Sequence, residues 1–86
     1  MSDLKSQFEA ASVEVKGLTR KPRNDDLLAL YSLFKQATIG DVAGKRPGML
    51  DLVGRAKYDA WAARKGETQD TSMKSYIELV ARLKKA

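Results

Sequence analysis

Four side chains in this sequence could together bind an anionic ligand: Tyr31, Lys35, Lys57 and Tyr76. Tyr31 and Lys35 are four residues apart, so on a helix their tips lie over the same surface spot. Two lysines from different helices can converge on one phosphate, and aromatic rings beside them can stack on a base. These residues therefore indicate a site for a ligand with an anionic head and an apolar body. The ordinary alternative is a packed apolar stripe beside solvated lysines, and for Tyr76 a core position with its hydroxyl at the rim.

Catalysis has little support in the same residues. The sequence contains no His and no Cys, which removes the usual general base, the usual zinc ligands and thiolate chemistry. Ser32 and Thr38 have no base to activate them, and the acidic residues are scattered without a metal-ligand pattern. We therefore expect a binding protein and not an enzyme, with no metal and no cofactor.

Length and charge limit the class of protein. The 86 residues suffice for one small domain, and no apolar run approaches the roughly 20 residues that span a bilayer. The N-terminus also lacks the apolar run of a signal peptide, so we expect a cytoplasmic protein. Residues 44–86 carry the whole net charge of +5, because acidic and basic residues balance in residues 1–43. This excess indicates a surface field for anions, with nucleic acid, membrane surfaces and phosphorylated small molecules all open as partners.

Apolar residues recur at helical spacing in four segments, which predicts helices over residues 4–16, 25–38, 52–65 and from 68 to near the end. The expected caps and glycine stops of these helices are Asn24, Asp51 and Thr68, and Gly17, Gly40 and Gly66. The apolar stripes of the first and last helices are alike, so these two helices should pack on each other. The irregular residues 41–48 are long enough to cross the end of a bundle. The fold class is therefore all-α, with four helices.

Several runs resemble the acyl-CoA-binding protein family in order and spacing, over nearly the whole chain from Phe8 to Leu83 and without a gap. The most specific runs are Tyr-x-x-Phe-Lys-Gln-Ala-Thr-x-Gly at 31–40, Arg-Pro-Gly-Met at 46–49 and Lys-Tyr-Asp-Ala-Trp at 57–61. The resemblance implies one domain over residues 1–86, an up-down-down-up four-helix bundle with a long crossover between its second and third helices. It also implies a monomer that carries medium- and long-chain acyl-CoA esters without chemistry, without nucleic acid and without stable membrane insertion.

The resemblance also implies a role for each site residue. Three residues match positions around the ribose 3′-phosphate of CoA: Tyr31, Lys35 and Lys57. The residues that match the nucleotide side are Phe34 against adenine, Tyr76 near the ribose, and Lys16. Those that match the acyl groove are Leu27 and Leu28. Phe34 stands where many members have Tyr, so a hydrogen bond from that hydroxyl is absent here.

Two rival classes remain as alternatives. A small basic nucleic-acid-binding module would explain the charged half and the aromatic residues, although no cluster of five or more basic residues occurs. A protein-interaction module would use an exposed apolar groove for a partner helix.

Overall fold

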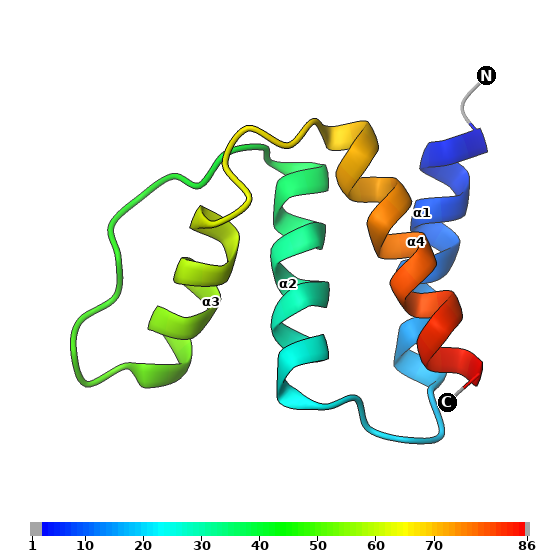
Figure 1. Cartoon of the computed structure of the whole chain (residues 1–86), viewed down its shortest axis with the longest axis horizontal. Helices are drawn as coiled ribbons and strands as arrows, with labels where there is room; N and C mark the ends of the chain where they lie inside the picture. Colours follow the sequence, from blue (N-terminus) through cyan, green and yellow to red (C-terminus); the bar gives the residue numbers. More distant parts are fainter. Residues whose placement is uncertain (1–2, 86) are drawn as a thin grey trace.

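The computed structural model describes residues 3–85 and contains four α-helices. These are α1 (Asp3–Glu14), α2 (Asn24–Thr38), α3 (Leu52–Ala62) and α4 (Gln69–Lys85), with a short 3₁₀ turn η1 (Val15–Gly17) after α1. The part of the chain described contains no strand, which confirms the all-α prediction. In Figure 1, α1 and α4 run in one direction and α2 and α3 in the other, so the predicted up-down-down-up order is confirmed. The resulting bundle is a slab of 38 × 31 × 15 Å.

The main core lies between α1, α2 and α4. Its buried members are apolar or aromatic side chains: Phe8, Ala11, Leu30, Leu33, Ala37, Tyr76, Leu79 and Val80. The predicted packing of α1 on α4 is therefore confirmed. The third helix is attached differently, because it packs on α2 and buries its Trp61 there. The indole Nε1 of Trp61 donates a hydrogen bond of 2.8 Å to the carbonyl oxygen of Gly40, which fixes α3 beside the end of α2.

Three predicted helix ends are wrong in detail. Gly17 does not take the left-handed conformation, because α1 narrows into η1 and the chain leaves through an extended Leu18. Asn24 is not the cap of α2, since the extended Arg23 holds that place without a side-chain hydrogen bond. The third helix ends at Ala62, three residues earlier than expected, and continues as turns. All three differences fall in the first or last turn of a helix, where tighter turns and extended residues compete with the regular α-helix.

The other predicted ends are confirmed. Gly40 and Gly66 have positive φ angles of 101° and 95°, a conformation that costs glycine little. Thr68 caps α4 by accepting the N–H of Thr71 at 3.1 Å. Asp51 caps α3 by accepting the N–H of Gly54 at 2.9 Å.

Replacing Asp51 by Ala is expected to lower the free energy of unfolding by about 1 kcal/mol, because the Gly54 N–H then loses its partner. Chemical denaturation measures the change. Asp51→Asn is the matched control, since an amide oxygen also caps well. Equal stability of the Ala variant and the unaltered chain would mean that the cap contributes nothing.

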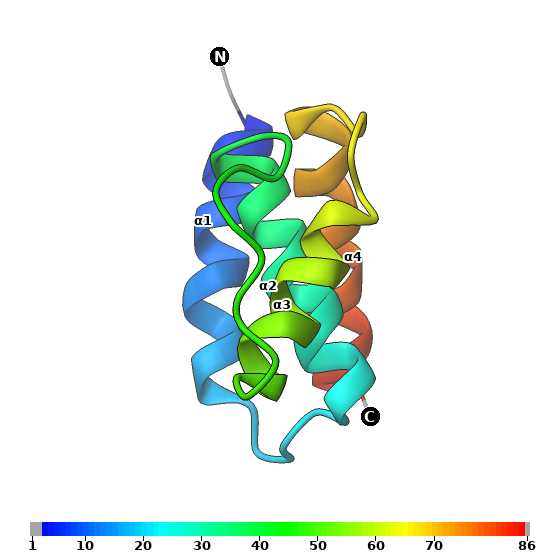
Figure 2. The ribbon, with the colours of Figure 1, turned by 90° about the vertical axis from the view of Figure 1, so that its left-hand side faces the viewer.

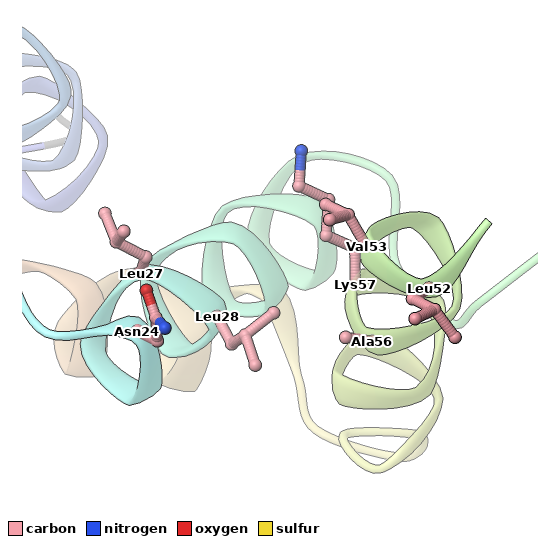
Figure 3. A pocket seen from close by; sticks show the side chains of 7 residues that line it. All are labelled: Asn24, Leu27, Leu28, Leu52, Val53, Ala56 and Lys57. Carbon is pink, nitrogen blue, oxygen red and sulfur yellow. The ribbon is translucent and has the colours of Figure 1, made fainter.

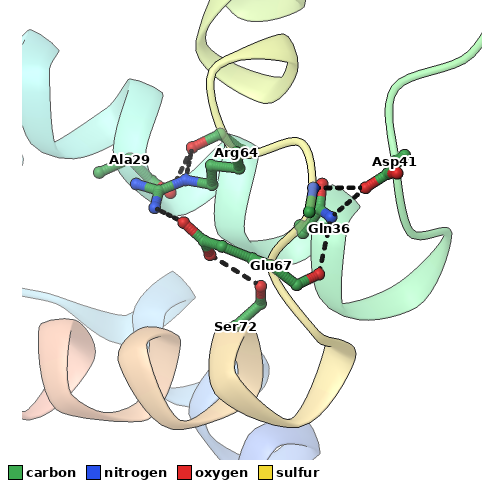
Figure 4. Close-up of polar contacts among 8 residues, drawn as sticks. Ala29, Gln36, Asp41, Arg64, Glu67 and Ser72 are labelled. Carbon is green, nitrogen blue, oxygen red and sulfur yellow. Dashed lines mark hydrogen bonds and ion pairs between the residues drawn. The ribbon is translucent and has the colours of Figure 1, made fainter.

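The buried side chain of Gln36 joins α2 to both long connections. Its Nε2 donates hydrogen bonds of 2.9 Å to Asp41 Oδ1 and to the carbonyl oxygen of Glu67 (Figure 4). Asp41 also accepts the N–H of Gly66 at 2.9 Å. These hydrogen bonds, first that from Gly66 and then that from Gln36, hold the pKa of the Asp41 carboxyl below its ordinary value.

A second group of polar contacts links α2 to the start of α4. Arg64 donates from Nε to the buried Ser32 hydroxyl at 2.6 Å and forms an ion pair of 3.2 Å with Glu67. Glu67 in turn accepts the hydroxyl of Ser72 at 3.0 Å (Figure 4). Because these contacts reach α2 from the chain that follows α3, they fix how far α3 stands from the core.

The connection between α2 and α3 follows α3 along its length (Figure 2). Three side chains of α3 hold it by contacts of 2.8–2.9 Å: Arg55 to the Pro47 carbonyl, Tyr58 to the Gly44 carbonyl, and Asp59 to Arg46. The two hydrogen bonds from the Arg46 guanidinium lower the pKa of Asp59 and raise that of Arg46. The long crossover expected between the second and third helices is therefore present and tethered.

Candidate functional site

An open groove of about 350 Å³ separates the first half of α2 from the first half of α3. Its lining is mostly apolar and consists of Asn24, Leu27 and Leu28 from α2 and Leu52, Val53, Ala56 and Lys57 from α3. Figure 3 shows Leu28 pointing toward α3, whereas Leu27 and the Lys57 ammonium lie toward one side of the helix pair. The groove exists because α3 packs on α2 through Trp61 near its far end, so the near ends are not filled by side chains.

Two lysines from different helices meet at one tyrosine ring beside this groove. The Nζ of Lys57 lies 5.3 Å from the centroid of the Tyr31 ring, and the Nζ of Lys35 lies 5.8 Å from it. Lys35 Nζ also lies 5.4 Å from the ring of Trp61. A ring face attracts each ammonium, but the two positive charges repel each other. Two cations beside one ring make this cluster positively charged, which suits it to a phosphate.

Three aromatic rings form a second cluster next to Lys35 in the sequence. Phe34 stacks on Phe8 with centroids 5.5 Å apart, and Tyr76 meets Phe8 edge-on at 5.1 Å. Phe8 and Tyr76 are buried, whereas Phe34 keeps 39% of its surface exposed. The exposed ring of Phe34 can therefore present a face to a flat ligand while the other two rings support it from the core.

The groove, the lysine pair and the aromatic cluster all involve α2. Leu27 and Leu28 line the groove, Tyr31 and Lys35 follow one and two turns later, and Phe34 belongs to the aromatic cluster. This order gives a continuous path from an apolar trough to two cations and then to an exposed ring. Such a path fits a ligand with a long apolar chain, a charged group and a flat ring system.

Comparison with known proteins shows the family to which the chain is related. The family described as "Acyl CoA binding protein" matches residues 5–80 of the chain. The chain is 49% identical over 83 residues to the acyl-CoA-binding protein of Brassica napus, covering 96% of this chain and 90% of that protein. This chain belongs to the acyl-CoA-binding protein family. It is also 47% identical to the Drosophila melanogaster homologue, over 86% of each chain.

Solved structures of the family share the fold. The crystal structure of Oryza sativa acyl-CoA-binding protein 2 superposes with a TM-score of 0.89 at 41% identity, covering 93% of this chain and 87% of that one. The crystal structure of the protein from Moniliophthora perniciosa gives a TM-score of 0.87 at 37% identity, covering 92% and 78% of the two chains. The fold and the family expected from the sequence are therefore confirmed.

The structure brings together most of the predicted site residues of this family member. Tyr31, Lys35 and Lys57 meet as described, and Leu27 and Leu28 line the groove that begins beside them. Phe34 and Tyr76 contact each other with centroids 6.0 Å apart, although Tyr76 is 4% exposed and is mainly a core residue. Lys16 lies exposed in η1 and is not among the residues that line the groove.

The α3 side of the groove is formed by Leu52, Val53 and Ala56, none of which was predicted to belong to the site. Spacing offered a signal only for Val53, which lies four residues before Lys57 and so shares its helix face. Helical periodicity alone does not say whether another helix covers that face.

The described residues also limit other kinds of site. Within residues 3–85, no group of three or more Asp or Glu could hold a metal ion. None of the helices in the same range combines the length and the hydropathy that crossing a bilayer requires.

Raising the pH above about 10 should destabilise the protein through Tyr76. Burial raises the pKa of its phenol above the ordinary value, so folding favours the protonated ring. The stabilising contribution of Tyr76 is fully present below the pKa that its phenol has in the unfolded chain. It is lost as the pH rises through the higher pKa that the phenol has in the folded protein. Denaturation at several alkaline pH values measures this loss, and Tyr76→Phe should show a weaker dependence. If the stability of Tyr76→Phe and of the unaltered chain depended on pH in the same way, Tyr76 would not be the cause of the alkaline loss.

Proposed function

We propose that this protein binds medium- and long-chain acyl-CoA esters and carries them as a monomer in the cytoplasm, without chemical conversion. The observation that carries the proposal is the convergence of Lys35 and Lys57 on Tyr31, directly beside an apolar groove. Membership of the family and the names of its relatives support the same ligand class. All groups of the site come from one chain, so a single copy suffices.

In this proposal, the ribose 3′-phosphate of CoA lies between the two ammonium groups. Hydrogen bonds to charged groups contribute roughly 1.5–3 kcal/mol each when water is partly excluded. Adenine stacks on the exposed face of Phe34, with Tyr76 supporting that ring from the core near the ribose. Lys16 supplies a further positive charge on the nucleotide side.

The acyl chain lies in the groove between α2 and α3. Leu27 and Leu28 contact it from one side, and Leu52, Val53 and Ala56 from the other. Burial of apolar carbon contributes about 0.8 kcal/mol per CH₂ before ordering costs. The groove is open, so a chain can enter from the side and does not require an enclosed cavity.

The intrinsic fluorescence of Trp61 tests the ligand class, because Lys35 Nζ lies over its ring and would move toward a bound phosphate. Titration with a long-chain acyl-CoA should change the fluorescence and saturate at one ligand per chain. A single-stranded oligonucleotide should bind weakly and lose its affinity steeply with salt. Tighter binding of the oligonucleotide than of acyl-CoA would favour the nucleic-acid alternative and overturn the proposal.

A further inference from the structure

Two cavities lie along the contact between α2 and α3. The groove described above has a volume of about 350 Å³, and a second cavity has about the same volume. We call the second one the back cavity; its apolar walls are formed by Leu28 and Ala29 of α2 and by Ala60 and Ala63 at the end of α3. Among residues 3–85, Leu28 alone lines both the groove and the back cavity.

The two cavities lie on opposite sides of Leu28. Successive residues of a helix are turned by about 100°, so Leu27 and Ala29 lie to either side of Leu28 on α2. Leu27 lines the groove and not the back cavity, whereas Ala29 lines the back cavity and not the groove. The Leu28 side chain points toward α3 (Figure 3). It therefore stands between the two cavities.

The surface of α3 opposite Leu28 consists of small residues. Ala56, Ala60 and Ala63 are spaced four and three residues apart, so they share one helix face. Ala56 lines the groove, whereas Ala60 and Ala63 line the back cavity. A methyl group reaches little beyond the backbone, so the larger side chain of Leu28 is what separates the two spaces.

Polar contacts fix the spacing of the two helices along the back cavity. Arg64 Nε donates a hydrogen bond of 2.6 Å to the Ser32 hydroxyl, and the Trp61 indole donates one of 2.8 Å to the Gly40 carbonyl. These contacts join the end of α3 to α2 and hold it there. A chain that lies in the groove therefore meets the Leu28 side chain and not a passage that widens freely.

We propose that Leu28 sets the longest acyl chain that the groove accommodates, because its side chain closes the groove toward the back cavity. This inference rests on the proposed function and names the residue that limits its ligand. The back cavity is also less favourable for the methyl end of a chain, since four of its eight lining residues are polar. Longer chains leave their last carbons in water, where these carbons add no affinity.

Calorimetry with a series of saturated acyl-CoAs tests the role of Leu28. In the unaltered chain, affinity should rise with chain length and then level off. In Leu28→Ala, the rise should continue for at least two further carbons. The expected gain is about five-fold for each two carbons, below the roughly 14-fold of two fully buried CH₂ groups, because the back cavity is partly polar.

The neighbouring leucine provides the matched control. Leu27 lines only the groove, so Leu27→Ala should weaken binding but level off at the same chain length as the unaltered chain. The double variant Leu28→Ala, Ala60→Leu should return the limit to its original length, because a leucine at position 60 refills the back cavity. Ala60→Leu alone should leave the dependence on chain length unchanged.

The outcomes separate the length limit from the carrier function. If the unaltered chain bound no acyl-CoA, the carrier function and the length limit would both be wrong. If the unaltered chain bound acyl-CoA but Leu28→Ala levelled off at the same chain length, only the length limit would be wrong.

A milder variant covers the case in which Leu28→Ala does not fold, since Leu28 is half-buried. Melting temperatures report whether each variant is folded. Leu28→Val shortens the same side chain by less and should move the limit in the same direction. An unchanged limit in a folded Leu28→Val would then overturn the proposal.

Discussion

Acyl-CoA is expected to bind at least about a thousand-fold more tightly than free CoA. Each buried CH₂ contributes about 0.8 kcal/mol, so about ten of them give roughly 8 kcal/mol before the cost of ordering the chain. Affinity should therefore rise with each added pair of carbons until the groove between α2 and α3 is filled, and then level off. Isothermal titration calorimetry with a series of chain lengths measures this dependence.

The affinity for the free fatty acid tests the contribution of the CoA part of the ligand. It has the same apolar chain but lacks the phosphates and adenine, so it should bind far more weakly than its CoA ester. Leu27→Ser should flatten the dependence on chain length because Leu27 lines the groove, whereas Ile39→Ser should not. Equal affinities for the ester and the free acid would contradict the account of a ligand held at both ends.

Replacing Lys35 or Lys57 by Ala is expected to weaken acyl-CoA binding by about 10- to 150-fold, which corresponds to roughly 1.5–3 kcal/mol for a hydrogen bond to a charged group. The loss should be similar for each variant, because both ammonium groups lie near the same ring. Calorimetry with one long-chain acyl-CoA measures it. Lys74→Ala is the matched control, since Lys74 is an exposed lysine on α4.

The same variants should keep nearly all their stability. Lys57 is exposed and Lys35 half-buried, so their truncation leaves no core cavity. Loss of the ring contacts of Lys35 with Tyr31 and Trp61 costs only about 0.5–1 kcal/mol at such sites. A large fall in melting temperature of either variant would show that the lysine is structural, and its effect on binding would then be indirect.

The helices and their main packing follow from local pattern in this sequence. Phe8 and Ala11 on one stripe, and Tyr76 and Val80 on the other, repeat at helical spacing and are all buried where α1 meets α4. The ends were less predictable. A glycine such as Gly17 is compatible with several turns, and the choice between them depends on the next element.

Only half of the lysine site could be predicted from spacing. Tyr31 and Lys35 are neighbours on one helix, so their contact follows from helical geometry. The approach of Lys57 depends on how α3 lies against α2, which in turn depends on Trp61, Gln36 and the contacts of the long connection. Residue type made Lys57 a candidate for this site, but no sequence spacing placed it beside Tyr31.

The exposed side chains at the start of α3 show a further limit of sequence patterns. Leu52 and Val53 have the residue types of a core, yet both are largely exposed. Whether an apolar residue is covered depends on the reach of the neighbouring helix, which periodicity does not contain. These positions are therefore the ones at which contact with the ligand could be inferred only from the structure.

Binding of acyl-CoA and of the same ester without its 3′-phosphate tests the lysine pair most directly. In the unaltered chain, removal of the phosphate should weaken binding by about ten-fold or more. In the Lys35→Ala, Lys57→Ala double variant it should make little difference, because the phosphate has lost both partners. If removal of the phosphate weakened binding equally in both proteins, these lysines would not hold it and the central claim would be wrong.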